Sequence, residues 1–218
     1  MTPRPKTTGA LALLSVSLLM AGCGGLFEST LASPQTYVLR VPPRTAPAAP
    51  IAANPGTLRV QRPEAGPGLN TELVALLRSD RRLDFYSATL WAAPAPDLME
   101  SLIVDSLRGS GLFAGVFDDS SPYAPHYTLR CALSRFEADY TGGGVAPTVH
   151  TRLDCTLGRH RDRVMLANFT AQGSAVAGAD RINAVIAAFE GATAVALAEI
   201  ERQAAAALSA EPRTSTSP

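Results

Sequence analysis

Three runs of alternating apolar and polar residues in the second half of the chain constrain the fold most strongly. They cover 126–140, 148–157 and 164–172. An alternation of period two is typical of a β-strand that buries one of its faces. The glycines at 142–144 separate the first two runs, and the Arg-Asp pair at 161–162 separates the second from the third. Because both separators are turn signals, the sequence predicts an antiparallel hairpin that continues into a meander.

The predicted hairpin brings two cysteines together. If its turn is centred on Gly143, residues at equal distances from that glycine face each other, which places Cys131 opposite Cys155. Two thiols on one face of neighbouring strands are a disulfide candidate in an oxidising compartment. The alternative is a pair of reduced cysteines that act as small core residues. A register slip of one residue would turn one of the two to the other face.

Two further segments have the period of a helix. Asp97 and Glu100 resemble a capping box, and the apolar stripe that follows them is expected to end at Gly109 or Gly111. The alanine-rich stretch 180–208 carries a second apolar stripe. We expect both helices to bury their stripes against the sheet.

The first half of the chain predicts shorter elements. Five prolines mark 42–56 as an extended surface connection. Asn70 or Thr71 can cap a short helix that runs to Leu77. Strands are expected at 35–41, 58–62, 82–91 and 112–117.

Together these elements predict a single α/β domain over 35–208. Its mixed β-sheet is packed by two main helices and ends in the antiparallel meander. The polar residues 209–218 that follow are expected to be a disordered tail.

The N-terminus resembles that of an exported lipoprotein. Basic residues precede an apolar run at 10–20, which is shorter than the ~20 residues of a membrane span. The ending Leu19-Met20-Ala21-Gly22-Cys23 resembles the bacterial lipobox, whose cysteine is acylated and becomes the mature N-terminus. We therefore predict a signal peptide at 1–22 and a lipid-anchored tether at 23–34. The alternative is an ordinary signal peptide followed by an incidental cysteine.

The residue after Cys23 predicts the membrane in which the lipid lies. Gly24 stands there rather than aspartate. In Gram-negative lipoprotein sorting this resembles an outer-membrane address, with the domain facing the periplasm.

Composition and motifs do not support catalysis, metal binding or nucleic-acid binding. The 19 basic and 19 acidic residues leave no basic field for nucleic acid. The sequence has no CxxC, HExxH or GxSxG motif, and its three histidines have no metal-ligand spacing to the cysteines. We expect no enzyme activity, no metal and no cofactor beyond the covalent lipid on Cys23. We also expect no membrane span after the signal peptide, because charged residues interrupt the apolar runs.

Trp91, the sole tryptophan, allows two interpretations. It lies at the end of a predicted strand, where a large side chain fills the corner between strand and helix. Tryptophan is also enriched at interface hot spots, so Trp91 is a partner-contact candidate.

The chain resembles the ABC-type transport auxiliary lipoprotein component family, the PqiC-like lipoproteins that accompany MCE-type lipid transporters. The resemblance covers about 35–208 and the signal. It rests on the lipobox, the opening Tyr37-Val38-Leu39, the block 83–94 with its helix, and the strand 127–137. The connection 42–56 and the paired cysteines have no counterpart in the family pattern.

The resemblance implies a compact α/β domain without enzymatic activity. It implies a docking role at the outer membrane, beside an MCE-domain protein and ABC transporter components, in envelope integrity and lipid transport, and a possible homo-oligomer. The alternative is a periplasmic lipid-anchored binding module that holds a small apolar ligand between the sheet and the alanine-rich helix. An enzyme would require a polar cluster assembled from distant residues.

Replacing the lipidation candidate tests the predicted anchor. Cys23→Ala should release the protein into the soluble periplasmic fraction, because an uncleaved h-region of this length holds a bilayer poorly and no acyl chain remains. Cell fractionation and immunoblotting measure the release. Membrane association equal to that of the unaltered chain would contradict the lipobox interpretation or show that a partner alone holds the domain.

Overall fold

The computed structural model of the 218-residue chain describes residues 33–41 and 54–211. The predicted signal peptide, Cys23, nearly all of the tether, most of the proline-rich connection and most of the tail lie outside these residues. The chain divides into two units after Ser33, and the described elements belong to the second. In chain order they are β1 (Gln35–Tyr37), β2 (Asn54–Val60), β3 (Glu64–Ala65), β4 (Leu73–Leu77), β5 (Leu83–Trp91), α2 (Ala95–Ser110), β6 (Phe113–Phe117), β7 (Tyr127–Asp139), β8 (Thr148–Arg159), β9 (Val164–Val176) and α3 (Ile182–Ala210).

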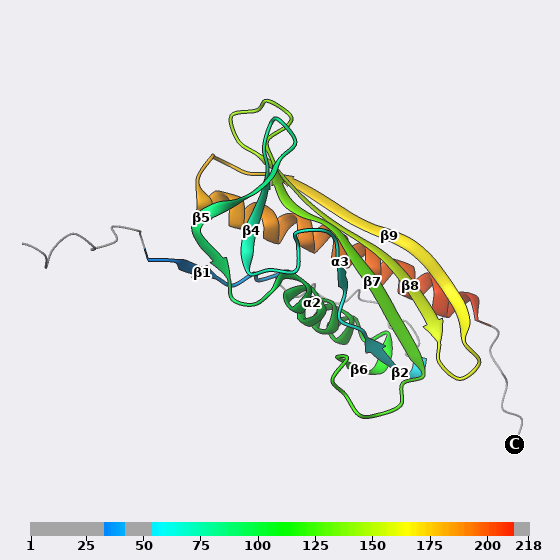
Figure 1. Cartoon of the computed structure of the whole chain (residues 1–218). Helices are drawn as coiled ribbons and strands as arrows, with labels where there is room; N and C mark the ends of the chain where they lie inside the picture. The colour runs from blue at the N-terminus through cyan, green and yellow to red at the C-terminus, as the bar shows by residue number, and fades with distance from the viewer. Residues whose placement is uncertain (1–32, 42–53, 212–218) are drawn as a thin grey trace, which may run out of the picture. The chain divides into compact units, whose positions relative to one another are not determined.

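The described strands form one mixed sheet with β7 at its centre (Figure 1). One edge of β7 pairs with β8, and β8 pairs with β9, both antiparallel. The other edge of β7 is shared by β2, β3 and β4, all parallel to it. Beyond these strands, β6 extends the sheet from β2, while β5 and then β1 extend it from β4. The predicted α/β class and the predicted meander are confirmed.

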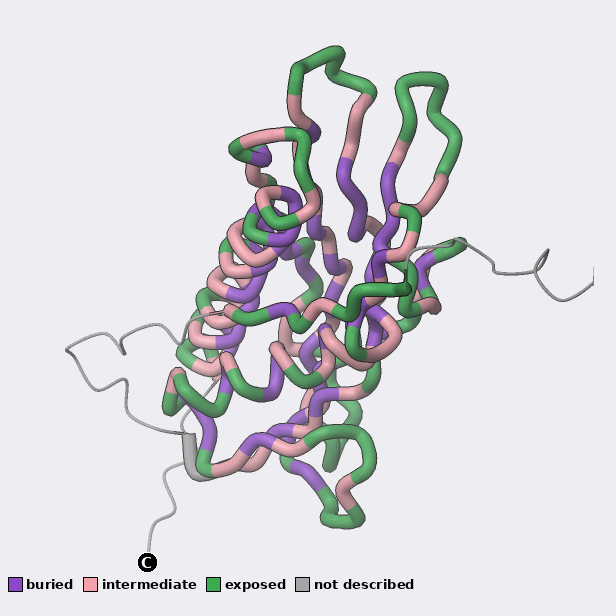
Figure 2. Tube along the Cα trace, turned by 90° about the vertical axis from the view of Figure 1, so that its left-hand side faces the viewer, coloured by how far each residue is buried: buried purple, intermediate pink, exposed green. Residues whose placement is uncertain are grey.

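Both helices lie on the same face of the sheet, and no other described helix or strand covers the opposite face (Figures 1 and 2). The alternation of the meander decides which side chains face the helices. The core between the layers includes Leu133 and Phe136 from β7, Leu153 from β8, Ile103 from α2 and Phe189 from α3, all with at most 1% of their surface exposed. We call the helix-covered side the core face and the other side the open face.

α3 is an alanine-rich core helix of 29 residues. By length and composition it could cross a membrane, so the expectation that no such segment follows the signal peptide is wrong. The helix is apolar enough because it is rich in alanine and has few charged residues over most of its length. In the structure α3 packs along β8 and β9 and buries Val185, Phe189 and Leu197. Its apolar residues therefore serve the core of the domain.

Residues 73–77 form strand β4, where we expected a short helix. A five-residue apolar run fits either structure. Here β4 is bonded to β5 on one side and to β7 on the other. The consecutive residues Val74, Ala75 and Leu76 are all buried, as is typical of a strand inside a sheet. Tertiary pairing therefore decides the structure of this run.

Two of the other predicted boundaries also differ. β1 ends at Tyr37 rather than at residue 41, because the chain leaves β5 there. β2 begins at Asn54, inside the segment that we assigned to the proline-rich connection.

The predicted capping box is wrong. α2 begins at Ala95, two residues before Asp97, and has no side-chain cap. Asp97 instead forms an ion pair with Arg62 at 2.5 Å. Glu100 accepts a hydrogen bond from the backbone N–H of Asp119 at 2.8 Å. Both carboxylates thus tie the helix to neighbouring segments, because partners distant in sequence compete successfully for them.

Gly173 sets the distance between β9 and α3. A Cβ atom at this position would lie 2.0 Å from the backbone carbonyl oxygen of Ala192. Gly173→Ala should therefore push the layers apart and lower the free energy of unfolding by about 1–3 kcal/mol, measured as a lower urea midpoint. The matched control Gly109→Ala meets no atom within 4 Å and should stabilise α2 by about 0.5–1 kcal/mol. Equal urea midpoints for Gly173→Ala and Gly109→Ala would contradict the close packing of β9 against α3.

Candidate functional site

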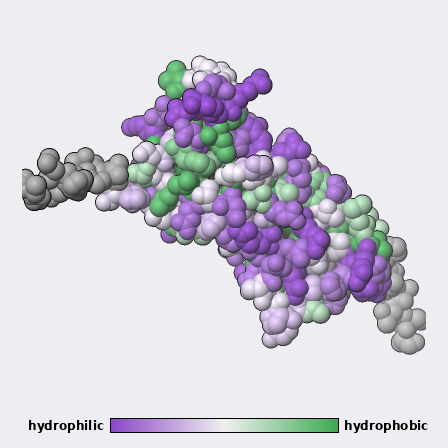
Figure 3. All heavy atoms as spheres, in the orientation of Figure 1, coloured by the Kyte–Doolittle hydropathy of each residue, from purple (hydrophilic) through white to green (hydrophobic). Residues whose placement is uncertain are grey.

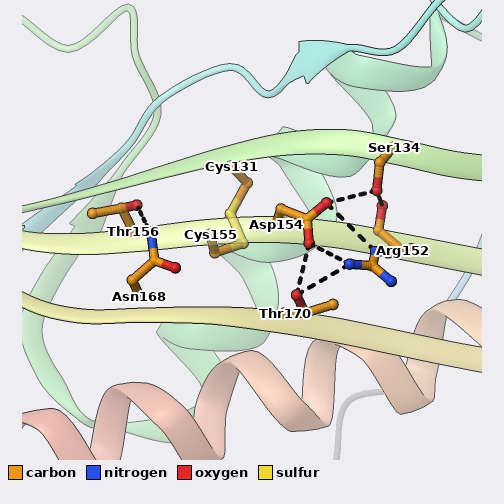
Figure 4. Close-up of a disulfide and its surroundings, with 8 residues drawn as sticks. All are labelled: Cys131, Ser134, Arg152, Asp154, Cys155, Thr156, Asn168 and Thr170. Atoms are coloured by element: carbon orange, nitrogen blue, oxygen red, sulfur yellow. Dashed lines mark hydrogen bonds and ion pairs between the residues drawn. A yellow bond between two sulfur atoms is a disulfide. The ribbon is translucent and has the colours of Figure 1, made fainter.

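The paired cysteines lie at the centre of the meander. Cys131 on β7 and Cys155 on β8 face each other in the expected register, and their sulfur atoms are bonded (Figure 4). The Cα atoms are 4.1 Å apart and the residues are separated by 24 positions in the sequence. Both side chains are buried on the core face. A buried bridge of this kind joins strands and is not a reactive thiol site.

A polar network covers the open face above this bridge. The Asp154 carboxylate accepts hydrogen bonds from Ser134 Oγ at 2.9 Å, Thr170 Oγ1 at 2.7 Å and an Arg152 Nη at 3.1 Å (Figure 4). The bond from Thr170 is the main reason that the pKa of Asp154 lies below its usual range. The network links β7, β8 and β9 across their strands. Its carboxylate is fully engaged, so the network supports the sheet and offers no general base.

A second charged cluster lies on the open face nearer the β7–β8 turn. Arg135 donates to Glu137 at 2.6 Å and to Asp139 at 3.0 Å. His150 Nε2 lies 3.8 Å from a carboxylate oxygen of Asp139. Burial, with Arg135 nearby, lowers the pKa of His150, so the imidazole is neutral at neutral pH. Arg135 is therefore the single cation that pairs with two carboxylates, those of Glu137 and Asp139.

Trp91 is a core residue, so of its two interpretations the structure supports the core position and not the partner contact. Only 1% of its surface is exposed. Its ring packs against Phe136 at 5.6 Å and Phe189 at 5.1 Å between centroids. The strand end at which Trp91 lies is covered by α3, which brings Phe189 onto the indole. A partner therefore cannot contact this side chain unless the domain opens.

A polar cleft lies at the end of the domain where the β4–β5 turn meets the start of α3. Its volume is about 420 Å³. Within it, Arg82 pairs with Asp80 at 2.6 Å, while Arg78 pairs with Asp84 beside it at 2.5 Å. It is lined by Leu76, Arg78, Ser79, Asp80, Arg82, Tyr140 and Asp180. Because its charges have both signs and are paired within the chain, the cleft does not select a charged ligand class.

Two tyrosines form a hydrogen-bonded chain beside this cleft. The hydroxyls of Tyr86 and Tyr140 are 2.8 Å apart, and Tyr140 donates to Asp180 at 2.6 Å. Burial raises the pKa of Tyr140, and its bonds to Asp180 and Tyr86 raise it further. Burial also raises the pKa of Tyr86. Both phenols therefore stay protonated at neutral pH and fix the start of α3 against the sheet.

An apolar patch interrupts the polar open face over β4 and β5 (Figure 3). Register places Leu73 and Leu77 of β4 on this face, with Leu83 and Phe85 of β5 beside them. Leu73 is 38% exposed and Leu83 is 42% exposed. We name these four residues the β4–β5 patch. An exposed apolar surface of this kind is typical of a contact site for another molecule.

Metal binding finds no support among the residues that the structure covers. In the ranges 33–41 and 54–211, no group of three or more histidine, cysteine, aspartate or glutamate side chains is arranged to hold an ion. The ring of His126 accepts a hydrogen bond from the backbone N–H of Thr57 at 3.0 Å, and the His126 carbonyl accepts one from the N–H of His160 at 2.8 Å. His150 lies near the other end of β8. Cys23, the lipidation candidate, lies outside the described residues.

Sequence reasoning missed the Asp154 network, the tyrosine chain and the β4–β5 patch. The alternating polar residues of the three meander strands are a sequence signal for the Asp154 network. Tyr86 and Tyr140 are 54 positions apart, so no local pattern joins them. The patch was missed because its β4 half was expected to be helical.

A mixed sheet with both helices on one face defines the chain as a two-layer α/β domain. The chain belongs to the family of ABC-type transport auxiliary lipoprotein components, which it matches over residues 37–201. The family that the sequence resembles is thus confirmed. No curated protein matches the chain at a significant level.

Solved structures show the same fold. A protein of Xanthomonas campestris from the DUF330 family is 24% identical, with a TM-score of 0.72, over 82% of this chain and 99% of that one. An uncharacterised protein is 18% identical, with a TM-score of 0.60, over 78% of this chain and 98% of that one. At these identities the likeness establishes the architecture.

Removing the bridge should destabilise the domain. Replacing Cys131 and Cys155 by alanine together should lower the free energy of unfolding by about 3 kcal/mol, because the unfolded chain regains the freedom of a 24-residue loop. Thermal unfolding with and without reductant measures the contribution of the disulfide to stability. Reductant should lower the melting temperature of the unaltered chain and leave that of the double variant unchanged. Insensitivity of the unaltered chain to reductant would contradict a bridge in solution.

Proposed function

We propose that this chain is a non-catalytic lipoprotein subunit of an intermembrane lipid transport system of MCE and ABC type. Acylated Cys23 would anchor it in the outer membrane, with the domain in the periplasm, where it docks to the transporter and supports envelope integrity. Membership of the transport auxiliary family is the observation that carries this proposal. The lipobox ending at Cys23 supports the anchor. The covalent lipid would be the only added group.

The β4–β5 patch supports docking as the mode of action. Leu73 and Leu83 are exposed in an apolar area over β4 and β5 that polar side chains adjoin (Figure 3). Covering two such side chains with a partner surface gains about 25 cal/mol for each Å² of apolar area. The charged groups nearby have partners within the chain, so a partner would not have to leave charges unpaired. We therefore place the transporter contact on this patch.

The alternative function, a module that holds a small apolar ligand between the sheet and α3, has less support. At Gly173 and Ala192 the two layers approach so closely that an added methyl group would clash. The cleft beside Tyr140 is large enough for a small ligand, but charged side chains line it. Neither place suits an acyl chain.

Co-purification tests the proposed function. The tagged full chain, extracted from native envelopes in mild detergent, should recover an MCE-domain protein and ABC components. Leu73→Asp combined with Leu83→Asp should lower that recovery about ten-fold or more, since burying a charge is unfavourable. The control Met165→Asp changes another exposed apolar residue, at the opposite end of the meander, and should recover as much as the unaltered chain.

Circular dichroism should show that all these variants are folded. Repeated recovery of no transport component by the unaltered chain would contradict the proposed function. Equal recovery by the folded patch variant would contradict the docking surface.

A further inference from the structure

Three connections of the chain form one end of the domain. They are residues 78–82 between β4 and β5, 140–147 between β7 and β8, and 177–181 between β9 and α3. The cleft beside Tyr140 is lined by residues of all three, so the connections lie together. Figure 1 shows the first two standing out beyond the sheet at the top of the view. We call these three connections the tip.

The two most exposed large apolar side chains of the described residues lie at this end. Val145, in the second connection, is 96% exposed, and Val176, directly before the third, is 72% exposed. A Cβ atom added at Gly142 or Gly143 would meet nothing within 4 Å, so the turn that carries Val145 stands clear of the domain. Single exposed apolar residues are common on proteins. The meaning of Val145 therefore depends on what else the tip presents.

The tip also carries an excess of arginine. Its charged residues are Arg78, Asp80, Arg81, Arg82, Asp180 and Arg181. Arg82 pairs with Asp80, and Arg78 pairs with Asp84 on β5. Arg81 and Arg181 are exposed and form no ion pair with any residue in the described ranges. A guanidinium group binds phosphate oxygens through two parallel N–H donors. Apolar and strongly hydrophilic side chains are thus neighbours at this end (Figure 3).

The direction of β1 shows that the chain enters the domain from the side of the tip. β1 is parallel to β5, with Gln35 opposite Thr89 and Tyr37 opposite Trp91. β5 starts at Leu83, directly after the first connection of the tip, so Gln35 is the end of β1 nearer the tip. Thr89 follows Leu83 by six residues, which places Gln35 at most ~20 Å from the tip.

The length of chain between Cys23 and Gln35 decides which end of the domain can meet the membrane. These 12 residues span at most ~40 Å when fully extended. The opposite end is farther from β1, because Tyr37 bonds to Asn183 at the start of α3 and the 29 residues of α3 rise ~43 Å. An anchor at Cys23 therefore lets the tip reach the bilayer easily, and the opposite end only with the connection stretched back along the domain.

We propose that the tip lies on the membrane that holds the acyl chains of Cys23, an anchor that belongs to the proposed function. Val145 and Val176 enter the boundary between headgroups and acyl chains, and Arg81 and Arg181 bind lipid phosphates. Exposed apolar residues combined with basic ones are what peripheral proteins use on bilayers.

A lipid surface fits the tip better than a protein partner for two reasons. The connection 140–147 contains no charged residue and three consecutive glycines, so it offers few side chains for specific pairing, which a lipid surface does not require. The anchor also keeps lipid at a high effective concentration beside the tip, so that a weak contact is sufficient.

The opposite end of the meander has a similar composition and supplies the matched control. Met165 is 63% exposed there, beside Arg161 and Arg163 in the exposed β8–β9 turn. Composition alone would therefore allow either end to meet the membrane, and only the direction of β1 and the length of the connection distinguish them.

Fluorescence in vesicles tests the orientation. The acylated full chain with Val145→Cys carries an NBD label in vesicles of phosphatidylethanolamine and phosphatidylglycerol; Cys131 and Cys155 are bonded to each other and do not take the label. The emission should shift to shorter wavelength, and nitroxide-labelled lipids should quench it several times more strongly than the same label at Met165→Cys. Equal quenching at the two positions, stronger quenching at Met165→Cys or none at either would overturn the inference.

Reversing charges tests the arginines. Arg81→Glu with Arg181→Glu should weaken the quenching of the label at Val145→Cys, because the glutamates repel lipid phosphates. Arg161→Glu with Arg163→Glu, at the opposite end, should leave it unchanged. Equal quenching in the two pairs of variants, each shown by circular dichroism to be folded, would overturn the phosphate contact.

The vesicles contain no transport component, so the test is separate from co-purification with the transporter. A chain that floats with the vesicles but shows no quenching at the tip would overturn this inference and leave the proposed function standing. A chain that does not float would contradict the anchor and this inference together.

Discussion

The pairing of β7 along both of its edges is the interaction on which the rest of the structure depends. A buried 13-residue strand must hydrogen-bond its backbone on both sides. β8 satisfies one side in a single antiparallel ladder. On the other side β2, β3 and β4 follow one another, and the N–H groups of Gln61 and Gly66 donate to the carbonyls of Leu129 and Leu133, each at 2.9 Å, near the joins between them. Residues 54–77 are thus held in place by their backbone hydrogen bonds to β7.

The one-sided cover of the sheet determines which side chains of its strands are buried. Both helices pack on the core face (Figure 2). The apolar side chains of each meander strand are therefore buried, and the alternating polar side chains face water. Several charged side chains on the open face form ion pairs with one another, as Asp154 does with Arg152. Among the described residues, the β4–β5 patch is one apolar surface that remains exposed.

The agreement between sequence and structure is best where a pattern is long. The meander extends over about 50 residues, so its alternation fixes both the strands and the face on which Cys131 and Cys155 lie. Between the turn and Arg135 the pairing is one residue away from the expected register. The bulge after Leu133 offsets this difference, so Cys131 and Cys155 face each other as expected. Gly111 ends α2 in the left-handed region, with a φ of 67°, as the sequence predicts.

The failures share a cause, which is competition from residues distant in sequence. Asp97 has the spacing of a helix cap, yet Arg62 binds its carboxylate. The five residues of β4 contain too few periods to separate helix from strand, and neighbours on both sides make them a strand. The position of Trp91 at a strand end was visible, but the ring of Phe189 that covers it comes from a helix almost 100 positions away.

By itself the sequence determined the lipoprotein-like N-terminus, the α/β class, the meander, the two principal helices and the resemblance to the family. These are properties of local pattern, and local pattern is sufficient for them because side-chain period and turn residues act within a few positions. Only the tertiary structure decided that β4 is a strand, that Trp91 is buried and which apolar residues remain exposed. Those outcomes depend on which segments meet in space, and backbone pairing across long stretches of chain is encoded by no single segment.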